Sequence, residues 1–145
     1  MTKRVRNALT ASGFALLYGA AFFSFVALVP VTCTGGSADS LMIGLYSLVL
    51  SIAGVLCVYF AKPPQIFYLA AIPLLPIAYW QLRFTFRLGN GYFFGSNSAC
   101  EAIMEYEFVP DGRELFFLAL WVSVNIVLLA GLAITFYRSR HSQNV

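Results

Sequence analysis

Four long apolar stretches divide the chain, at residues 8–32, 41–61, 66–82 and 115–137, and none of them contains Asp, Glu, Lys, Arg or His. A helix needs about 20 such residues to cross a bilayer. The apolar runs are continuous rather than alternating, which favours helices over a β-barrel. The pattern therefore predicts four transmembrane helices.

We expect an all-α integral membrane protein, with residues 1–145 forming one domain. Its fold would be an antiparallel four-helix transmembrane bundle with one structured extracytoplasmic loop at residues 83–114. The composition agrees, because 60% of the residues are hydrophobic and 10% charged, against about 25% charged in soluble domains. The first stretch exceeds the ~7–15 residues of a signal-peptide core, so we expect it to be retained as the first helix.

The basic residues predict the orientation. Three of the nine, Arg83, Arg87 and Arg113, lie on one side of the predicted spans. The other side holds the remaining six, which are Lys3, Arg4, Arg6, Lys62, Arg138 and Arg140. The side richer in Lys and Arg is normally cytoplasmic, so we expect both termini in the cytoplasm. We expect the membrane to be a bacterial inner (plasma) membrane. The formal net charge of +3 is too small to indicate a nucleic-acid partner.

The predicted outer loop at 83–114 is the main polar segment and holds five of the six acids. Its first part, 83–94, alternates polar and apolar residues around a Gly89-Asn90-Gly91 turn, which is typical of a hairpin. Alternatively, the third helix continues through it, and we favour this because an isolated two-stranded hairpin is marginally stable. The candidate partner-binding residues of the loop are Arg83, Arg87, Glu101, Glu105, Glu107 and Asp111.

The acids also suggest a calcium site, but they lack the spacing of an EF-hand. We favour a solvated or ion-paired surface, and we expect no metal and no cofactor. Cys33 and Cys100 both fall on the predicted outer side, which is oxidising, so we expect a disulfide between them. The alternative is two free thiols that lie too far apart to meet.

Small residues predict where helices pack closely. One set, in the first stretch, has members four residues apart: Ala11, Ala15 and Gly19. Whether this set packs within the chain or between chains stays open. The second stretch has spacings of three, four and three, and is the best candidate for a buried helix–helix contact: Gly44, Ser47, Ser51 and Gly54. Asn125 needs a hydrogen-bond partner in mid-span, and we interpret it as a helix–helix contact. Pro73 and Pro76 predict a kink in the third span.

No motif identifies a reaction. The hypothesis we favour is a non-catalytic accessory, assembly or interaction subunit that presents the acidic loop to another membrane or extracytoplasmic protein. Self-association into a homo-oligomer stays open. One alternative is a membrane thiol–disulfide oxidoreductase, although such enzymes use Cys-x-x-Cys pairs, and this chain has three cysteines and no such pair. Another is a carrier of small molecules or lipids, although the spans lack the ionisable residue that couples transport to an ion.

Overall fold

Every regular element in the described part of the chain is a helix. The computed structural model describes residues 2–34, 38–94 and 113–143. Its elements are α1 (Lys3–Thr34), α2 (Ala38–Ala61), the short 3₁₀ helix η1 (Gln65–Ala71), α3 (Leu74–Phe94) and α5 (Arg113–Gln143). Three helices are long and apolar enough to cross a membrane, and η1 with α3 makes a fourth crossing if this bent pair is one span. This confirms an all-helical chain with the character of a membrane protein.

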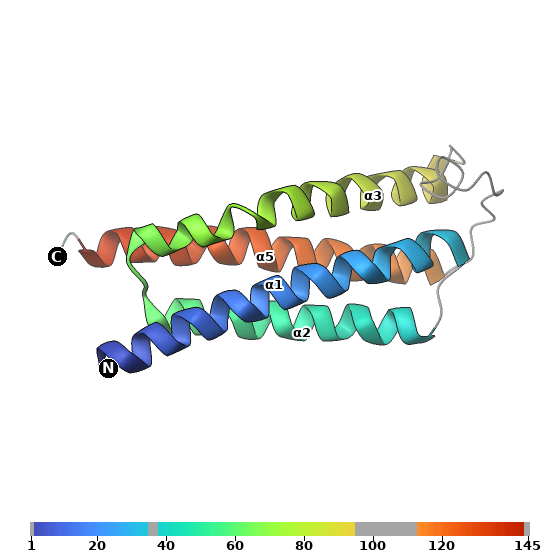
Figure 1. Cartoon of the computed structure of the whole chain (residues 1–145). Coiled ribbons are helices and arrows are strands. Elements are labelled where there is room, and N and C mark those ends of the chain that lie inside the picture. The colour runs from blue at the N-terminus through green and yellow to red at the C-terminus, as the bar shows by residue number, and fades with distance from the viewer. Residues whose placement is uncertain (1, 35–37, 95–112, 144–145) are drawn as a thin grey trace.

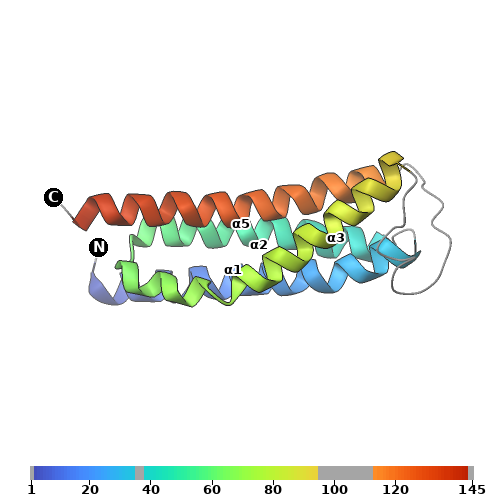
Figure 2. The same cartoon turned by 90° about the horizontal axis from the view of Figure 1, so that it is seen from above.

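The long helices lie side by side and run alternately in opposite directions (Figure 1). The two termini lie at one end of the bundle, which we call the terminal end. The segment between α3 and α5 leaves from the other end, which we call the loop end. Seen from above, α3 crosses the bundle diagonally: it starts beside α1 and ends beside the beginning of α5 (Figure 2). Which end faces the cytoplasm remains a prediction from the charges.

The third crossing is bent at the predicted prolines. The axes of η1 and α3 meet at 46° across a short break that contains Pro73. A proline removes one backbone hydrogen bond and crowds the preceding turn, so an uninterrupted helix cannot pass through it. The kink predicted from Pro73 and Pro76 is therefore present.

Residues 83–94 continue the third crossing as a helix, since α3 reaches Phe94. Of the two conformations weighed from the sequence, the favoured helix extension is the one observed, and no hairpin forms there. The helix carries Arg83 and Arg87 on one side, one turn apart.

Two glycines let α1 and α2 approach closely. A Cβ atom at Gly54 would lie 2.8 Å from Cγ of Leu17 and 3.0 Å from the carbonyl oxygen of Gly13. A Cβ at Gly13 would lie 2.8 Å from Val58 and 3.1 Å from the carbonyl oxygen of Gly54. Only glycine leaves room for two backbones at this separation.

The second close approach joins α2 to α5, which run in the same direction. A Cβ at Gly44 would lie 2.6 Å from Leu120, and one at Gly131 would lie 2.5 Å from Val55. The two contacts have the same offset along the two helices, so α2 and α5 stay in register over their length. The core formed around these contacts includes Phe14, Leu17, Val58, Leu74, Val124 and Leu128.

Candidate functional site

A layer of buried polar side chains lies in the half of the bundle nearer the loop end. All four crossings contribute to it, through Ser24 of α1, Ser47 of α2, Gln81 of α3, and Trp121 and Asn125 of α5. Each of these side chains is at most 1% exposed. Because polar groups in a membrane interior need partners within the protein, this layer is the part of the fold where polar chemistry concentrates.

Hydrogen bonds in the layer join three helices. Gln81 Nε2 donates to the carbonyl oxygen of Ala21 at 3.0 Å and to Ser24 Oγ, which links α3 to α1. Trp121 Nε1 donates to the carbonyl oxygen of Ser24 at 3.1 Å, which links α5 to α1. Both side chains reach the stretch of α1 around Ala21 and Ser24. The layer therefore fixes the positions of α3 and α5 against α1.

The register of the helices brings further polar groups to the same level. Gly89 of α3 faces Leu118 of α5, so two turns deeper Gln81 and Asn125 lie level with each other. The α2–α5 register likewise places Ser47 level with the turn that holds Asn125. The oxygens Gln81 Oε1, Asn125 Oδ1 and Ser47 Oγ are buried and have no hydrogen-bond partner among the described residues. Such groups are where internal water is normally held.

Asn125 differs in detail from the prediction. It is buried, but its Nδ2 donates to the carbonyl oxygen of Trp121 at 2.9 Å, one turn back in its own helix. The hydrogen bond that the structure gives it is thus within α5 rather than between helices. In this layer, the hydrogen bonds between helices come from Gln81 and Trp121. Gln81 was not among the residues predicted from the sequence, although a glutamine inside a span is the same kind of signal as an asparagine.

The two predicted sets of small residues lie in different surroundings. Gly44, Ser47, Ser51 and Gly54 are all buried, facing α1 and α5. Ala11 and Ala15 are exposed on the outside of the bundle, and the Cβ position at Gly19 meets only Leu50, at 4.0 Å. The residue of α1 that packs tightly is Gly13. The sequence pattern could have indicated Gly13, because Gly13, Leu17, Ala20 and Ser24 follow helical spacing. In the structure all four are buried.

The predicted partner-binding residues are described only in part. Arg83 is exposed and its guanidinium lies 5.1 Å from the centre of the Trp80 ring, while Arg87 is half-buried. Glu101, Glu105, Glu107 and Asp111 lie outside the described residues. So do Cys100 and the side chain of Cys33, which leaves the disulfide a prediction. Cys57 is half-buried and is a free thiol.

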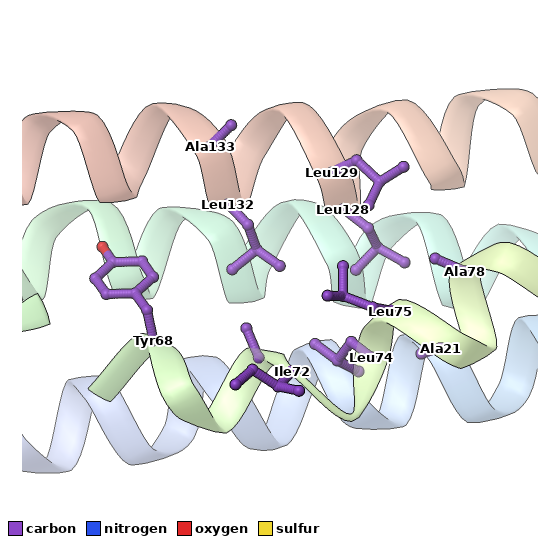
Figure 3. Close-up of a pocket in the computed structure, with 11 residues that line it drawn as sticks. Ala21, Tyr68, Ile72, Leu74, Leu75, Ala78, Leu128, Leu129, Leu132 and Ala133 are labelled. Carbon is purple, nitrogen blue, oxygen red and sulfur yellow. The ribbon is translucent and has the colours of Figure 1, made fainter. Parts of the chain in front are cut away.

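A cavity of about 250 Å³ lies beside the bend of the third crossing (Figure 3). Leu75 and Ala78 of α3 face Leu128, Leu129 and Leu132 of α5 across it. The ring of Tyr68, from η1, stands at one end (Figure 3). Bending at the prolines separates η1 from α5 here and leaves the space.

No three of the described His, Cys, Asp and Glu residues come together as a metal site would require. In the comparisons with known proteins, no protein-family model, no curated protein and no solved structure matched the chain.

Proposed function

We propose that this protein is a non-catalytic accessory, assembly or interaction subunit of a membrane complex. In this proposal it lies in a bacterial inner membrane with both termini in the cytoplasm, and it presents residues 83–114 to a protein partner outside. The observation that supports it is the buried polar layer directly beneath the loop end. The layer ties α3 and α5, the two helices that carry the loop, to α1.

A loop whose ends are fixed in this way is suited to binding a protein partner. The part of the loop between Phe94, the last residue of α3, and Arg113, the first residue of α5, is held at both ends by long helices. Fixing the ends of a segment reduces the conformational entropy that it loses when it binds. Arg83, which is exposed, and Arg87, which is half-buried, add polar surface along the side of α3.

The test is photo-crosslinking in living cells at native expression level. A photoreactive amino acid replaces Phe94, which is exposed at the edge of the loop, and crosslinked products are identified by mass spectrometry. We expect one stoichiometric protein partner, and we expect the crosslink to be lost when Glu101→Lys and Glu105→Lys reverse two loop charges.

The matched control is Glu101→Asp with Glu105→Asp, which keeps both charges and should keep the crosslink. Equal membrane levels of the variants, measured by immunoblot, separate lost binding from lost folding. The proposal fails if the charge-reversed protein crosslinks to the same partner as strongly as the unchanged protein. It fails equally if the unchanged protein crosslinks only to lipid or to itself.

A second candidate function is that of a carrier or binder of apolar small molecules or lipids, and the cavity beside the bend favours it. Its volume of about 250 Å³ exceeds the ~150 Å³ that holds benzene in an engineered cavity. It is smaller than the ~300 Å³ typical of the smallest drug-sized sites. One hydrocarbon chain or one small ring would fill it.

This second function is tested by filling the cavity. Ala133→Leu adds volume at the cavity wall, whereas Ala130→Leu adds it at an exposed position of the same helix outside the lining. A bound apolar molecule should be extracted from the unchanged protein and from the Ala130 variant, and be absent from the Ala133 variant. Identical extracts from all three proteins would rule the cavity out as the binding site.

A further inference from the structure

A second apolar hollow, of about 540 Å³, lies at the loop end between α3 and α5. Its lining comes from the part of α3 between Leu82 and Phe94 and from Leu118 and Val122 of α5. We call it the loop-end groove. Phe86, Phe93 and Phe94 are exposed, so the groove opens on the outside of the bundle. The candidate membrane spans end at Arg87 in α3 and begin at Leu118 in α5, so a bilayer around them would have its surface at this opening.

One polar group in the groove needs a partner. Thr85 lines the groove and is 5% exposed, and its Oγ1 is buried without a hydrogen bond to any described residue. A threonine in a helix normally satisfies its hydroxyl by donating to a carbonyl one turn back. A buried hydroxyl that is left unpaired in an apolar place is unfavourable. An occupant of the groove with an acceptor oxygen would satisfy it.

Positive charge runs along one edge of the groove. Arg83, Arg87, Asn90 and Phe94 follow one another at helical spacing on α3, and the last two line the groove themselves. The two arginines therefore stand on the same edge. Guanidinium groups suit phosphate because they donate two parallel hydrogen bonds to it.

We propose that the loop-end groove binds an anionic phospholipid. An acyl chain lies against Leu82, Phe86 and Val122, the Thr85 hydroxyl donates to an ester carbonyl oxygen, and the phosphate lies at the edge with Arg83 and Arg87. A phospholipid combines the three features that the groove requires, namely a hydrocarbon chain, a buried acceptor and a negative charge. The proposal is independent of the protein partner proposed above, because its test contains no other protein.

Tryptophan fluorescence reports on lipid that lies next to Arg83, at the edge of the groove. The chain has two tryptophans. Trp80 is 46% exposed and lies beside Arg83, whereas Trp121 is 1% exposed. The full-length protein is reconstituted in phosphatidylcholine vesicles, and phosphatidylglycerol or phosphatidylcholine with brominated acyl chains is added in increasing amounts. Bromine quenches a tryptophan that it touches, and Trp80→Phe identifies the part of the signal that comes from Trp80, which lies beside Arg83 and outside the groove lining.

We expect brominated phosphatidylglycerol to quench Trp80 at lower concentration than brominated phosphatidylcholine. Arg83→Gln with Arg87→Gln should weaken this preference about fivefold for each arginine removed. Thr85→Val keeps the shape of the side chain and removes its hydroxyl, and should weaken binding of phosphatidylglycerol about threefold. The matched control is Lys3→Gln with Arg4→Gln, which removes two exposed charges at the terminal end and should change nothing.

Four results would overturn the proposal. Equal quenching by both lipids would show that the groove does not select negative charge. An unchanged preference in the arginine variant would place the anionic lipid elsewhere, and an unchanged affinity in the Thr85 variant would place it outside the groove. An equal loss in the terminal-end control would show that net charge, rather than a local site, attracts the lipid. Circular dichroism establishes that each variant is as helical as the unchanged protein.

Discussion

The close crossing of α1 and α2 is directly testable by adding one methyl group. Gly54→Ala places a Cβ atom 2.8 Å from Cγ of Leu17 and 3.0 Å from the carbonyl oxygen of Gly13. Neither atom can move away easily. Leu17 is fully buried in the main core cluster, and the Gly13 oxygen belongs to the backbone. The helices must therefore separate by some tenths of an ångström to accept the change.

The size of the effect follows from two opposing contributions. Overfilling a packed interior costs about 1–3 kcal/mol, and replacing glycine by alanine in a helix returns about 0.5–1 kcal/mol. Gly54→Ala should thus lower the free energy of unfolding by about 1 kcal/mol, within a range of about 0–2.5 kcal/mol. Gly19→Ala is the matched control, because its Cβ would meet only Leu50, at 4.0 Å. That variant should be neutral or slightly more stable.

The assay is unfolding in mixed micelles with increasing SDS, followed by circular dichroism. The midpoint for Gly54→Ala should lie clearly below that of the unchanged protein, and the midpoint for Gly19→Ala should lie at or above it. If both variants unfold at the same point, the two backbones are not in contact at Gly13 and Gly54. If Gly19→Ala is the less stable of the two, α1 packs through its other face.

Three further predictions concern single contacts. Trp121→Phe removes the indole donor that holds α5 to α1, so the same unfolding assay should show a loss of about 0.6–1.7 kcal/mol, and no loss would mean that this bond does not stabilise the bundle. Tyr59→Leu removes the ring that lies 3.8 Å from the Arg138 guanidinium, and we expect a loss of about 0.5–1 kcal/mol, whereas Tyr46→Leu, at an exposed tyrosine on the same helix, should lose less. If Cys33 and Cys100 form the predicted disulfide, maleimide should label Cys57 alone in denatured, unreduced protein. Labelling of all three thiols would exclude that disulfide.

Much of the fold was predictable from local patterns. The hydrophobic effect and the thickness of the bilayer together require long apolar helices, so the three membrane-length helices and the bent pair that makes a candidate fourth could be read from the sequence. The prolines at 73 and 76 lack the backbone donors that a straight helix needs, so the kink could be predicted as well. The extension of α3 through residues 83–94 was an open choice, because alternation of polar and apolar residues is compatible with either structure over so short a segment.

The candidate site was less predictable. The stripe of small residues from Gly44 to Gly54 indicated a face of α2 that is in fact buried, but the similar set in α1 faces outward, and the tight contact uses Gly13 instead. Small side chains are a requirement for close packing on whichever face meets a neighbour, and the sequence does not say which face that is. The same reason explains Asn125, whose need for a hydrogen bond was evident but whose partner proved to be in its own helix.

Local composition and backbone chemistry are enough to indicate that the chain is helical, that it has the character of a membrane protein and where the third crossing bends. The assembled bundle was needed to show that Gln81 and Trp121 meet α1 at the same turn, and that α3 and α5 leave a groove between them. Those features depend on the rotation and register of helices that lie far apart in the sequence. A helix buries whichever face its neighbours cover, and that is a property of the assembled bundle rather than of any one segment.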